Sequence, residues 1–328
     1  MAIGILSTGS FLPRRVVTNK ELESVVDTTD AWIVSRTGIR ERRRAEDGAA
    51  SSDLGTIAGM RALHSGGLSQ LQIDGLVVAT SSPDYIQPAT ACVLQAKLGM
   101  GAVTAFDVSA VCTGFVYGLT AAVGMMRGFP QQYRRMLVVG AEAYSRILDP
   151  TDRSTSVFFG DGAGAVVLGE VPDGYGVLSA HLMADGTQAD VVGVPAGGSA
   201  EPASHATVSA RRHYFHMNGP KVWEFATTQL PGAIKEALLQ ADLGVEDVSL
   251  MITHQANARL IEAVGAAVGI SQDKVALTVE RYGNTAAASV PITLDEAVAA
   301  GRLKRGDVVV LASVGGGMTA GAVVLRWY

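Results

Sequence analysis

The six residues AGAVVL occur twice in this chain, at positions 163–168 and again at 320–325. One such match could be a coincidence, because Ala, Gly and Val are common here. The two copies do not stand alone, however, since four short apolar runs in the first half correspond in order to four in the second. The pairs are DGLVVATS with VSLMITHQ, VTAFDVSA with VALTVERYGN, RMLVVGAE with DVVVLASVGGG, and AGAVVLGE with AGAVVLRW. We infer an internal duplication, which restricts the chain to folds built from two similar halves.

The separations between corresponding runs are similar. The aligned residues are Leu76 with Leu250 (174 residues apart), Val108 with Val279 (171 apart) and Leu137 with Val308 (171 apart), while the AGAVVL copies are 157 apart. Short Val- and Leu-rich runs without alternation are typical of strands buried on both faces, and helix-length segments between them indicate an α/β fold. We therefore predict a five-layered αβαβα sandwich, with one half at residues 1–172 and the other at 173–328.

Composition excludes several classes of protein. With 48% hydrophobic and 17% charged residues among 328, a large core is expected and disorder is not. The net charge of -5 argues against a nucleic-acid surface. Two cysteines, Cys92 and Cys112, form neither a disulfide framework nor a zinc-binding pair, so no metal is expected. Neither a signal peptide nor a membrane-length apolar stretch is evident, so we expect a cytoplasmic protein.

Three residues with catalytic chemistry stand at corresponding places in the two halves. Cys112 follows AFDVSAV, and Asn284 follows ALTVERYG 172 residues later. His254 follows the strand-like SLMIT. Corresponding strand ends converge in a pseudo-symmetric pair, so a thiol, an imidazole and an amide could meet at the junction of the halves.

Each of these residues also has a purely structural interpretation. A thiol at a helix N-terminus is favoured as the thiolate, but Cys112 could be a buried structural cysteine, as we interpret Cys92. A lone His such as His254 is more often structural, and Asn284 could be a cap or turn residue. The stretch GDGAGAVV runs into a strand, which excludes a dinucleotide fingerprint. SVGGGMTAG is better explained as a tight turn that approaches a reacting group.

Five motifs together resemble those of β-ketoacyl-acyl-carrier-protein synthase III, a family of the thiolase superfamily. They are DVSAVCTGFVYGL, FGDGAGAVVL, HQANARLI, RYGNTAAASVP and SVGGGMTAGAVV. DTTDAWIVSRTGIRERR resembles the primer-binding region of that family, and the similarity extends from about residue 3 to residue 328.

The resemblance implies a decarboxylating condensation without a cofactor. Cys112 would take an acyl group from a coenzyme A thioester. His254 and Asn284 would hydrogen-bond the thioester carbonyl of a malonyl group carried by acyl carrier protein. The backbone N–H groups of Cys112 and Gly316 would form an oxyanion hole, worth roughly 3 kcal/mol per donor. Thiolases proper use other catalytic groups, including a second cysteine, for a non-decarboxylative reaction, so the presence of Asn284 implies that the reaction here is decarboxylative.

The same resemblance assigns binding residues. Those expected to hold the adenine and phosphates of coenzyme A are Trp32, Arg36 and Arg153. Those expected to line the pantetheine channel are Thr28, Gly219, Ala256 and Asn257. Arg259 would help to dock the acidic carrier protein. The family forms homodimers, and SSPDYIQPAT would reach toward the acyl pocket of the partner subunit.

The chain departs from the family around the expected acyl pocket. The departures are Val314 for a bulky aromatic residue, Met318 and Ala320 for Phe and Trp, and Gln87 for a residue that is often Phe. Smaller side chains leave space unless their neighbours collapse inward. We therefore expect an acyl primer or second substrate bulkier than acetyl.

Three alternatives stay open at this point. A papain-like cysteine hydrolase orders Cys, His and Asn in the same way, and the separation of 142 residues from Cys112 to His254 fits its spacing. Its C-G-[SA]-C-[WY] context is missing, and the duplicated pattern is wrong for it. A binding protein on a decayed synthase fold is a second alternative. A specialised starter-unit ketosynthase of a polyketide or alkylquinolone-like pathway is the third.

Overall fold

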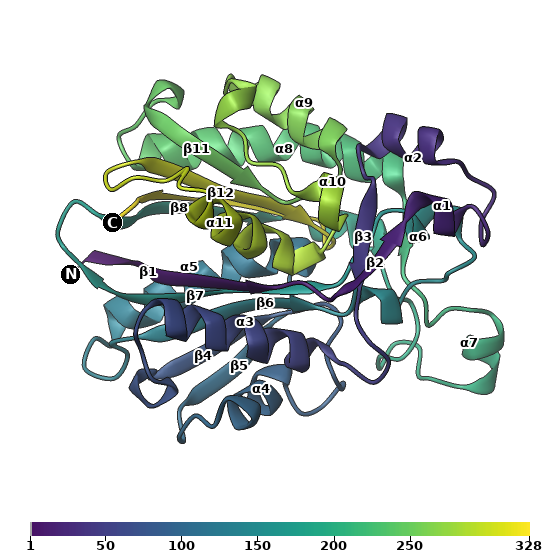
Figure 1. The fold of residues 1–328 in the computed structure, drawn as a ribbon, viewed down its shortest axis with the longest axis horizontal. Coiled ribbons are helices and arrows are strands. Elements are labelled where there is room, and N and C mark those ends of the chain that lie inside the picture. The colour runs from purple at the N-terminus through teal and green to yellow at the C-terminus, as the bar shows by residue number, and fades with distance from the viewer. Residues whose placement is uncertain (1) are drawn as a thin grey trace.

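The computed structural model describes residues 2–328, which fold around two stacked mixed β-sheets (Figure 1). In spatial order, the strands of the first sheet are β1 (Ala2–Phe11), β7 (Gly162–Val171), β6 (Met136–Glu142), β4 (Gly75–Ala79) and β5 (Thr104–Val108). Those of the second are β11 (Val248–Thr253), β12 (Val308–Gly315), β13 (Thr319–Arg326) and β8 (Gly176–Ala184). Within residues 2–328, no helix is both long and apolar enough to cross a membrane.

Helices cover both faces of each sheet (Figure 1). The outer layers contain α3 (Ser51–Ser65) and α4 (Thr90–Leu98) on the first sheet, and α8 (Gly219–Gln240) and α9 (Ala258–Val268) on the second. The middle layer contains α5 (Gly114–Gly128) and α11 (Ser289–Ala299). Side chains alternate along the strands, so Leu76 faces an outer core while Val77 faces the middle one. The predicted αβαβα sandwich is confirmed.

The shorter elements include several that gather at the end of the sandwich opposite the chain termini (Figure 1). The helices among them are α1 (Asn19–Leu22), α2 (Asp30–Thr37), α6 (Arg153–Ser156), α7 (His205–Ser209) and α10 (Val279–Tyr282). The strands form two ribbons, β2 (Arg15–Thr18) with β3 (Glu41–Arg44) and β9 (Val192–Gly193) with β10 (His216–Met217).

The strand registers correct two of the predicted correspondences. With the two AGAVVL copies superposed, Val167 corresponds to Val324. Their partners across the ladder are Leu137 and Val310, so Leu137 corresponds to Val310 and not to Val308. Leu76 pairs with Leu137 and Met251 with Val310, so Leu76 corresponds to Met251 and not to Leu250. The shift at Leu76 matters because one residue along a strand reverses the face. We keep the interpretation of an internal duplication, with the residue correspondences that these strand registers give.

The run VALTVERYGN is not a strand, so the predicted match of Val108 with Val279 is wrong. Val275 makes an isolated bridge to Met251, and Val279 begins α10. The reason lies in Gln255, whose side-chain oxygen accepts the N–H groups of Thr278 (2.8 Å) and Val279 (3.1 Å). Those donors are therefore not available to a sheet ladder.

Two short 3₁₀ turns lead into the middle helices and position the site. The turn Val111–Thr113 precedes α5, and the turn Ala286–Ala288 precedes α11. Each begins with a left-handed residue, Val111 at φ 47° and Ala286 at φ 43°. Non-glycine residues rarely adopt this conformation, and a β-branched residue such as Val does so at a cost that the surrounding structure must offset.

Candidate active site

One cavity of about 260 Å³ is lined by residues from both halves of the chain. It brings Cys112, His254 and Asn284 together, as the sequence predicts. Further predicted residues on its wall are Arg36, Gly219, Ala256, Asn257, Val314, Gly316 and Met318. The remaining wall is mostly apolar and includes Val111, Phe158, Phe159, Val192, Phe215, Met217, Val222, Trp223 and Leu260.

Cys112 lies in the strained turn between β5 and α5. The hydroxyl of Ser313 on β12 donates to the carbonyl oxygen of Cys112 at 2.7 Å and fixes the turn against the second sheet. Burial raises the pKa of the Cys112 thiol well above its ordinary value, and the carboxyl group of Glu142 raises it further. The resting group is therefore a thiol. We expected the helix to favour the thiolate, but desolvation outweighs the dipole of α5, which begins two residues later.

Asn284 is held by backbone and side-chain contacts. Its N–H donates to the carbonyl oxygen of Phe158 at 2.8 Å, and its own carbonyl accepts the N–H of Gly160 at 3.0 Å. The side-chain oxygen Oδ1 accepts the N–H of Ala286 at 2.9 Å. Because this contact orients the amide, the Nδ2 group is the part of the Asn284 side chain that can donate to a ligand.

His254 follows β11, and its N–H donates to the carbonyl oxygen of Ala312 on β12 at 2.8 Å. The ring atom Nδ1 lies 2.8 Å from the Ser289 hydroxyl oxygen. Burial lowers the pKa of His254 to about 3. The imidazole is therefore neutral at physiological pH and carries a single N–H, on either Nδ1 or Nε2.

The glycine turn between β12 and β13 lies beside the Cys112 turn. A Cβ atom placed on Gly315 would come within 2.8 Å of the Cys112 backbone nitrogen, and one on Gly316 would meet Val192 and Val111. Only glycine allows so close an approach of two backbone segments. The predicted tight turn beside a reacting group is present, with Gly316 on the cavity wall.

The residues expected to hold coenzyme A divide into two groups. Arg36, Gly219, Ala256 and Asn257 line the cavity. Trp32 lies on α2 outside the lining, and the guanidinium carbon of Arg153 stands 5.2 Å from the centre of its ring.

Thr28 and Arg259 also lie outside the cavity. Thr28 is not part of the lining, although we expected it there, and its hydroxyl oxygen is buried without a hydrogen-bond partner. The charge of Arg259, on α9, is partly neutralised by Glu262 at 3.2 Å.

The expected acyl pocket needs one correction, at Ala320. Val314 and Met318 line the cavity, but Ala320 does not. Ala320 is fully buried in the core under α8 and α9 and pairs with Val314 and Met183 in the sheet, so the packed interior takes up the space of the smaller side chain. Gln87 is exposed on the loop after β4, outside the lining. Cys92 is also exposed on α4 and not buried as we interpreted it.

Sequence reasoning missed an aromatic cluster beside Cys112, the aromatic floor, formed by Tyr144, Phe159 and Phe215. The ring centres of Tyr144 and Phe159 are 4.4 Å apart and stacked, and Phe215 meets both edge-on. It also missed Glu142, which is fully buried at the end of β6. The signal for Glu142 was available, since an acidic residue ends the otherwise apolar run MLVVGAE. Residues from distant segments build the aromatic floor, so no local pattern indicates it.

Comparison with known proteins agrees with this arrangement. Residues 106–186 match the family model described as 3-oxoacyl-[acyl-carrier-protein (ACP)] synthase III, and residues 238–327 match the model of its C-terminal part. The chain is 46% identical over 327 residues to the beta-ketoacyl-[acyl-carrier-protein] synthase III of Caldanaerobacter subterraneus subsp. tengcongensis, covering 100% of this chain and 98% of that protein.

Solved structures show the same fold. The 3-oxoacyl-[acyl-carrier-protein] synthase III of Aquifex aeolicus VF5 is 39% identical, with a TM-score of 0.90 over 99% of this chain and 100% of that one. The priming β-ketosynthase of the R1128 polyketide pathway is 32% identical, with a TM-score of 0.91 over 99% and 96%. The fold excludes a papain-like hydrolase. The similarity over the whole chain to acyl-condensing enzymes supports an enzyme over a binding protein without catalytic activity.

Proposed function

The chain belongs to the 3-oxoacyl-[acyl-carrier-protein] synthase III family of acyl-condensing transferases, and from this premise we propose the roles of its residues. Cys112 carries the acyl group, while His254 and Asn284 act on the malonyl donor. The observation that carries the proposal is that all three side chains reach one largely apolar cavity from separate elements of the two halves.

In the first step, the Cys112 sulfur attacks the thioester carbonyl of an acyl-coenzyme A. The new carbon–sulfur bond forms as the bond to the coenzyme A sulfur breaks, and the thiol proton ends on the departing coenzyme A. The N–H groups of Cys112 and Gly316 stabilise the negative oxygen of the tetrahedral intermediate. Splitting the reaction at an acyl-cysteine makes two easier steps out of one.

In the second step, the malonyl thioester loses carbon dioxide. The electron pair of the broken carbon–carbon bond passes into an enolate, whose oxygen accepts hydrogen bonds from the Asn284 Nδ2 group and from the His254 imidazole. The enolate carbon attacks the acyl-cysteine, and Cys112 leaves and regains a proton. The low pKa of His254 suits this role. The neutral imidazole can donate its N–H to the enolate oxygen, and it is too weak a base to take the proton of the thiol.

The substrates enter past the mouth of the cavity. Trp32 and Arg153, already stacked on one another, would bind the adenine and phosphate end of coenzyme A together with Arg36. Gly219, Ala256 and Asn257 line the pantetheine path, and Arg259 assists an acidic carrier protein. We assign no role in coenzyme A binding to Thr28, which lies outside the cavity lining. We further propose a cytoplasmic homodimer, in which Gln87 would approach the partner's acyl pocket.

The test separates loading from condensation. His254→Ala and Asn284→Ala should each still acquire one acyl group from acetyl-coenzyme A, seen by intact-protein mass spectrometry. Their rate of condensation with malonyl-acyl carrier protein should fall about 100- to 1,000-fold, because a donor to the enolate oxygen is lost. Variants that fail to load, or that load and condense at the wild-type rate, would contradict these roles.

We also propose a primer larger than acetyl, as in a specialised starter-unit ketosynthase. The observation that favours this is Val314, which lines the cavity at the position where the family resemblance implies a bulky aromatic residue. Val314→Phe should lower kcat/KM for branched and medium-chain acyl-coenzyme A several-fold more than for acetyl-coenzyme A. A wild-type preference for acetyl that the substitution leaves unchanged would return the chain to primary fatty-acid synthesis.

A further inference from the structure

Asn284 is joined to the chain before it by a glycine in the left-handed region. Gly283 has φ 65°, and a Cβ atom placed on it would come within 2.6 Å of the carbonyl oxygen of Phe158. Glycine has the most backbone freedom of all residues, so it restrains its neighbour less than another residue would. The position of Asn284 therefore also depends on how firmly Tyr282, the residue before this glycine, is held.

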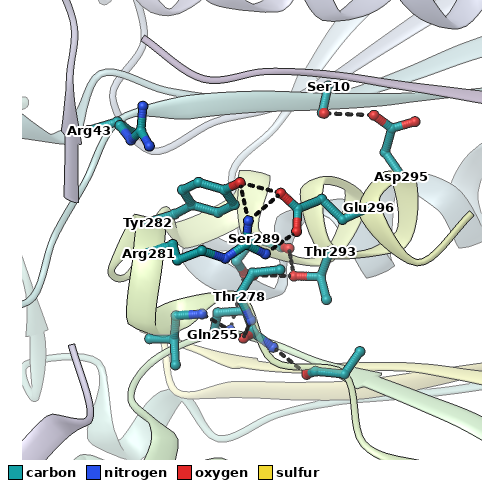
Figure 2. A network of polar contacts seen from close by, with 12 residues as sticks. Ser10, Arg43, Gln255, Thr278, Arg281, Tyr282, Ser289, Thr293, Asp295 and Glu296 are labelled. Atoms are coloured by element: carbon teal, nitrogen blue, oxygen red, sulfur yellow. Dashed lines mark hydrogen bonds and ion pairs between the residues drawn. The ribbon is translucent and has the colours of Figure 1, made fainter. Parts of the chain in front are cut away.

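The side chain of Tyr282 is held by Glu296 on α11 (Figure 2). Its hydroxyl donates to Glu296 Oε1 and accepts from Arg281 Nη1 at 2.8 Å, and the Arg281 guanidinium also pairs with the Glu296 carboxylate. Burial and the neighbouring carboxylate raise the pKa of Tyr282 to about 12, so the hydroxyl keeps its proton for this bond. The guanidinium carbons of Arg281 and Arg43 lie 4.8 and 5.7 Å from the centre of the Tyr282 ring, distances at which a cation attracts the ring face.

The contact between Glu296 and Tyr282 joins the segments that hold the two proposed donors. The backbone of Asn284 is hydrogen-bonded to residues 158–160, whereas His254 Nδ1 lies 2.8 Å from a hydroxyl oxygen in the first residue of α11. Glu296 lies about two turns further along the same helix. The contact therefore links the helix beside His254 to the chain that leads into Asn284.

We propose that Tyr282, Arg281 and Glu296 form a clamp that positions Asn284 relative to His254 for the condensation step. The inference rests on the proposed function, because two donors act on one enolate oxygen only if their separation suits it. A displacement of about 1 Å can lower a rate about a hundredfold, even when its cause lies far from the chemistry. The three clamp residues lie outside the cavity lining, so they act through Asn284 and not on a substrate.

The residue next to Glu296 provides a matched control. Asp295 is also a half-buried carboxylate on α11, but it accepts the hydroxyl groups of Thr8 and Ser10 on β1, each at 2.6 Å (Figure 2). Asp295→Ala and Glu296→Ala each remove a carboxylate from the same helix and replace it with a good helix former. The two variants differ in whether the lost contact leads to Asn284.

The first measurement separates loading from condensation. Glu296→Ala should load an acyl group and keep its KM for acyl-coenzyme A, because Cys112 is supported by β12 instead. Its kcat for condensation should fall about tenfold. Glu296→Gln keeps an oxygen for the Tyr282 hydroxyl and should retain most of the wild-type kcat. Asp295→Ala should lose stability without this split, and an equal loss of kcat in Asp295→Ala and Glu296→Ala would contradict the inference.

A double-mutant cycle with Asn284 tests the clamp most sharply. The effects of two residues that act through one another do not add. In the Asn284→Ala background, Glu296→Ala should therefore change kcat by less than about twofold, since the group that the clamp positions is absent. If Glu296→Ala does not fold, Tyr282→Phe takes its place in the cycle, because it removes the hydroxyl and keeps the ring.

The cycle also distinguishes the clamp from the proposed function. A similar loss of kcat on Glu296→Ala in the wild-type and Asn284→Ala backgrounds would overturn the clamp alone. Condensation at the wild-type rate by Asn284→Ala itself would overturn the proposed function and the clamp with it.

Discussion

The two 3₁₀ turns of this molecule share a backbone conformation but carry different side chains, a thiol in the first and a methyl group in the second. Val111 and Ala286 both adopt φ near 45°, and a middle-layer helix follows each turn at the same distance. By this correspondence Cys112 matches Ala287. The sequence alignment paired Cys112 with Asn284, which instead lies two residues before the second turn. The site is thus less symmetric than the duplication suggested.

Each turn packs on the strand end of the other half, and the residue at that strand end differs. The turn with Cys112 contacts β12, and the turn with Ala287 contacts β6. In the ladder register, Glu142 at the end of β6 corresponds to Gly315 at the end of β12. The Glu142 carboxylate accepts the N–H of Ala287 at 3.3 Å. Gly315 has no side chain, so none covers the N–H of Cys112.

This difference accounts for a single proposed reactive centre in a chain that we interpret as duplicated. In the second turn the N–H of Ala287 donates to an internal carboxyl group, that of Glu142. In the first turn we propose that the N–H of Cys112 donates instead to a transient oxyanion, since backbone N–H groups of such turns favour a negative charge. Glu142 also accepts the N–H groups of Ser81 (3.1 Å) and Ser82 (3.0 Å), so it ties the loop after β4 to the second turn.

The largest expected effect comes from moving the thiol between the turns. Cys112→Ala should abolish covalent loading, because no other nucleophile faces the donors. Adding Ala287→Cys to this variant should not restore loading, although the backbone geometry is equivalent. Ala287 is fully buried and its N–H is already bound to Glu142. Mass spectrometry with acetyl-coenzyme A measures both variants.

The control for the moved thiol is Ala287→Cys alone, which should load acyl groups on Cys112 if the protein folds. One added sulfur in this packed site is expected to cost about 1–3 kcal/mol in stability. Stoichiometric loading of the doubly substituted protein would show that the backbone of the turn alone is sufficient for acylation. The difference between Glu142 and Gly315 would then not explain which turn is reactive.

A smaller effect concerns the pH dependence of stability. Burial raises the pKa of Glu142 from 4.5 to about 7, although hydrogen bonds from Ser82 and Ser81 oppose the shift. The folded state thus holds this proton more tightly than the unfolded state. The stabilisation is complete below pH 4.5 and is lost as pH rises through 7, a decline on the order of 3 kcal/mol. Denaturant unfolding at several pH values measures it.

Glu142→Gln is the matched variant, since it keeps the shape and removes the titration. Its free energy of unfolding should lack this decline between pH 4.5 and 7, and the difference from the wild type isolates Glu142 from other groups. Parallel pH profiles for the two proteins would mean that Glu142 titrates alike in both states, as a solvated carboxyl would.

The layered fold could be predicted from sequence because its signal is local. Short apolar runs such as RMLVVGAE became strands, and the repeated order of runs indicated two sheets. The run at VALTVERYGN failed because a distant side chain, that of Gln255, takes its backbone donors. The predicted correspondences of Leu76 and Leu137 with residues of the second half were also wrong. Hydrophobic runs without alternation do not indicate which residue faces which layer.

The meeting of Cys112, His254 and Asn284 in one cavity could be predicted from motifs, whereas the residues that support them could not. Cys112, His254 and Asn284 each follow a recognisable pattern. The contacts of Ser289 with His254 and of Glu142 with Ala287 join residues 35 and 145 positions apart. Ala320 does not line the cavity for the same reason. Alignment to a family motif says which residue replaces which, but not which side of a strand or loop it occupies in this chain.

The most direct measurement of the central claim locates the acyl group in the wild-type protein. After exposure to acetyl-coenzyme A, intact mass and peptide mapping report how many thiols are acylated and where. Cys92 serves as an internal control, because it is exposed and lies outside the cavity. The account predicts one acyl group per chain, on Cys112, which a malonyl thioester then removes. An adduct on Cys92 alone, or one on Cys112 that the malonyl donor leaves in place, would contradict it.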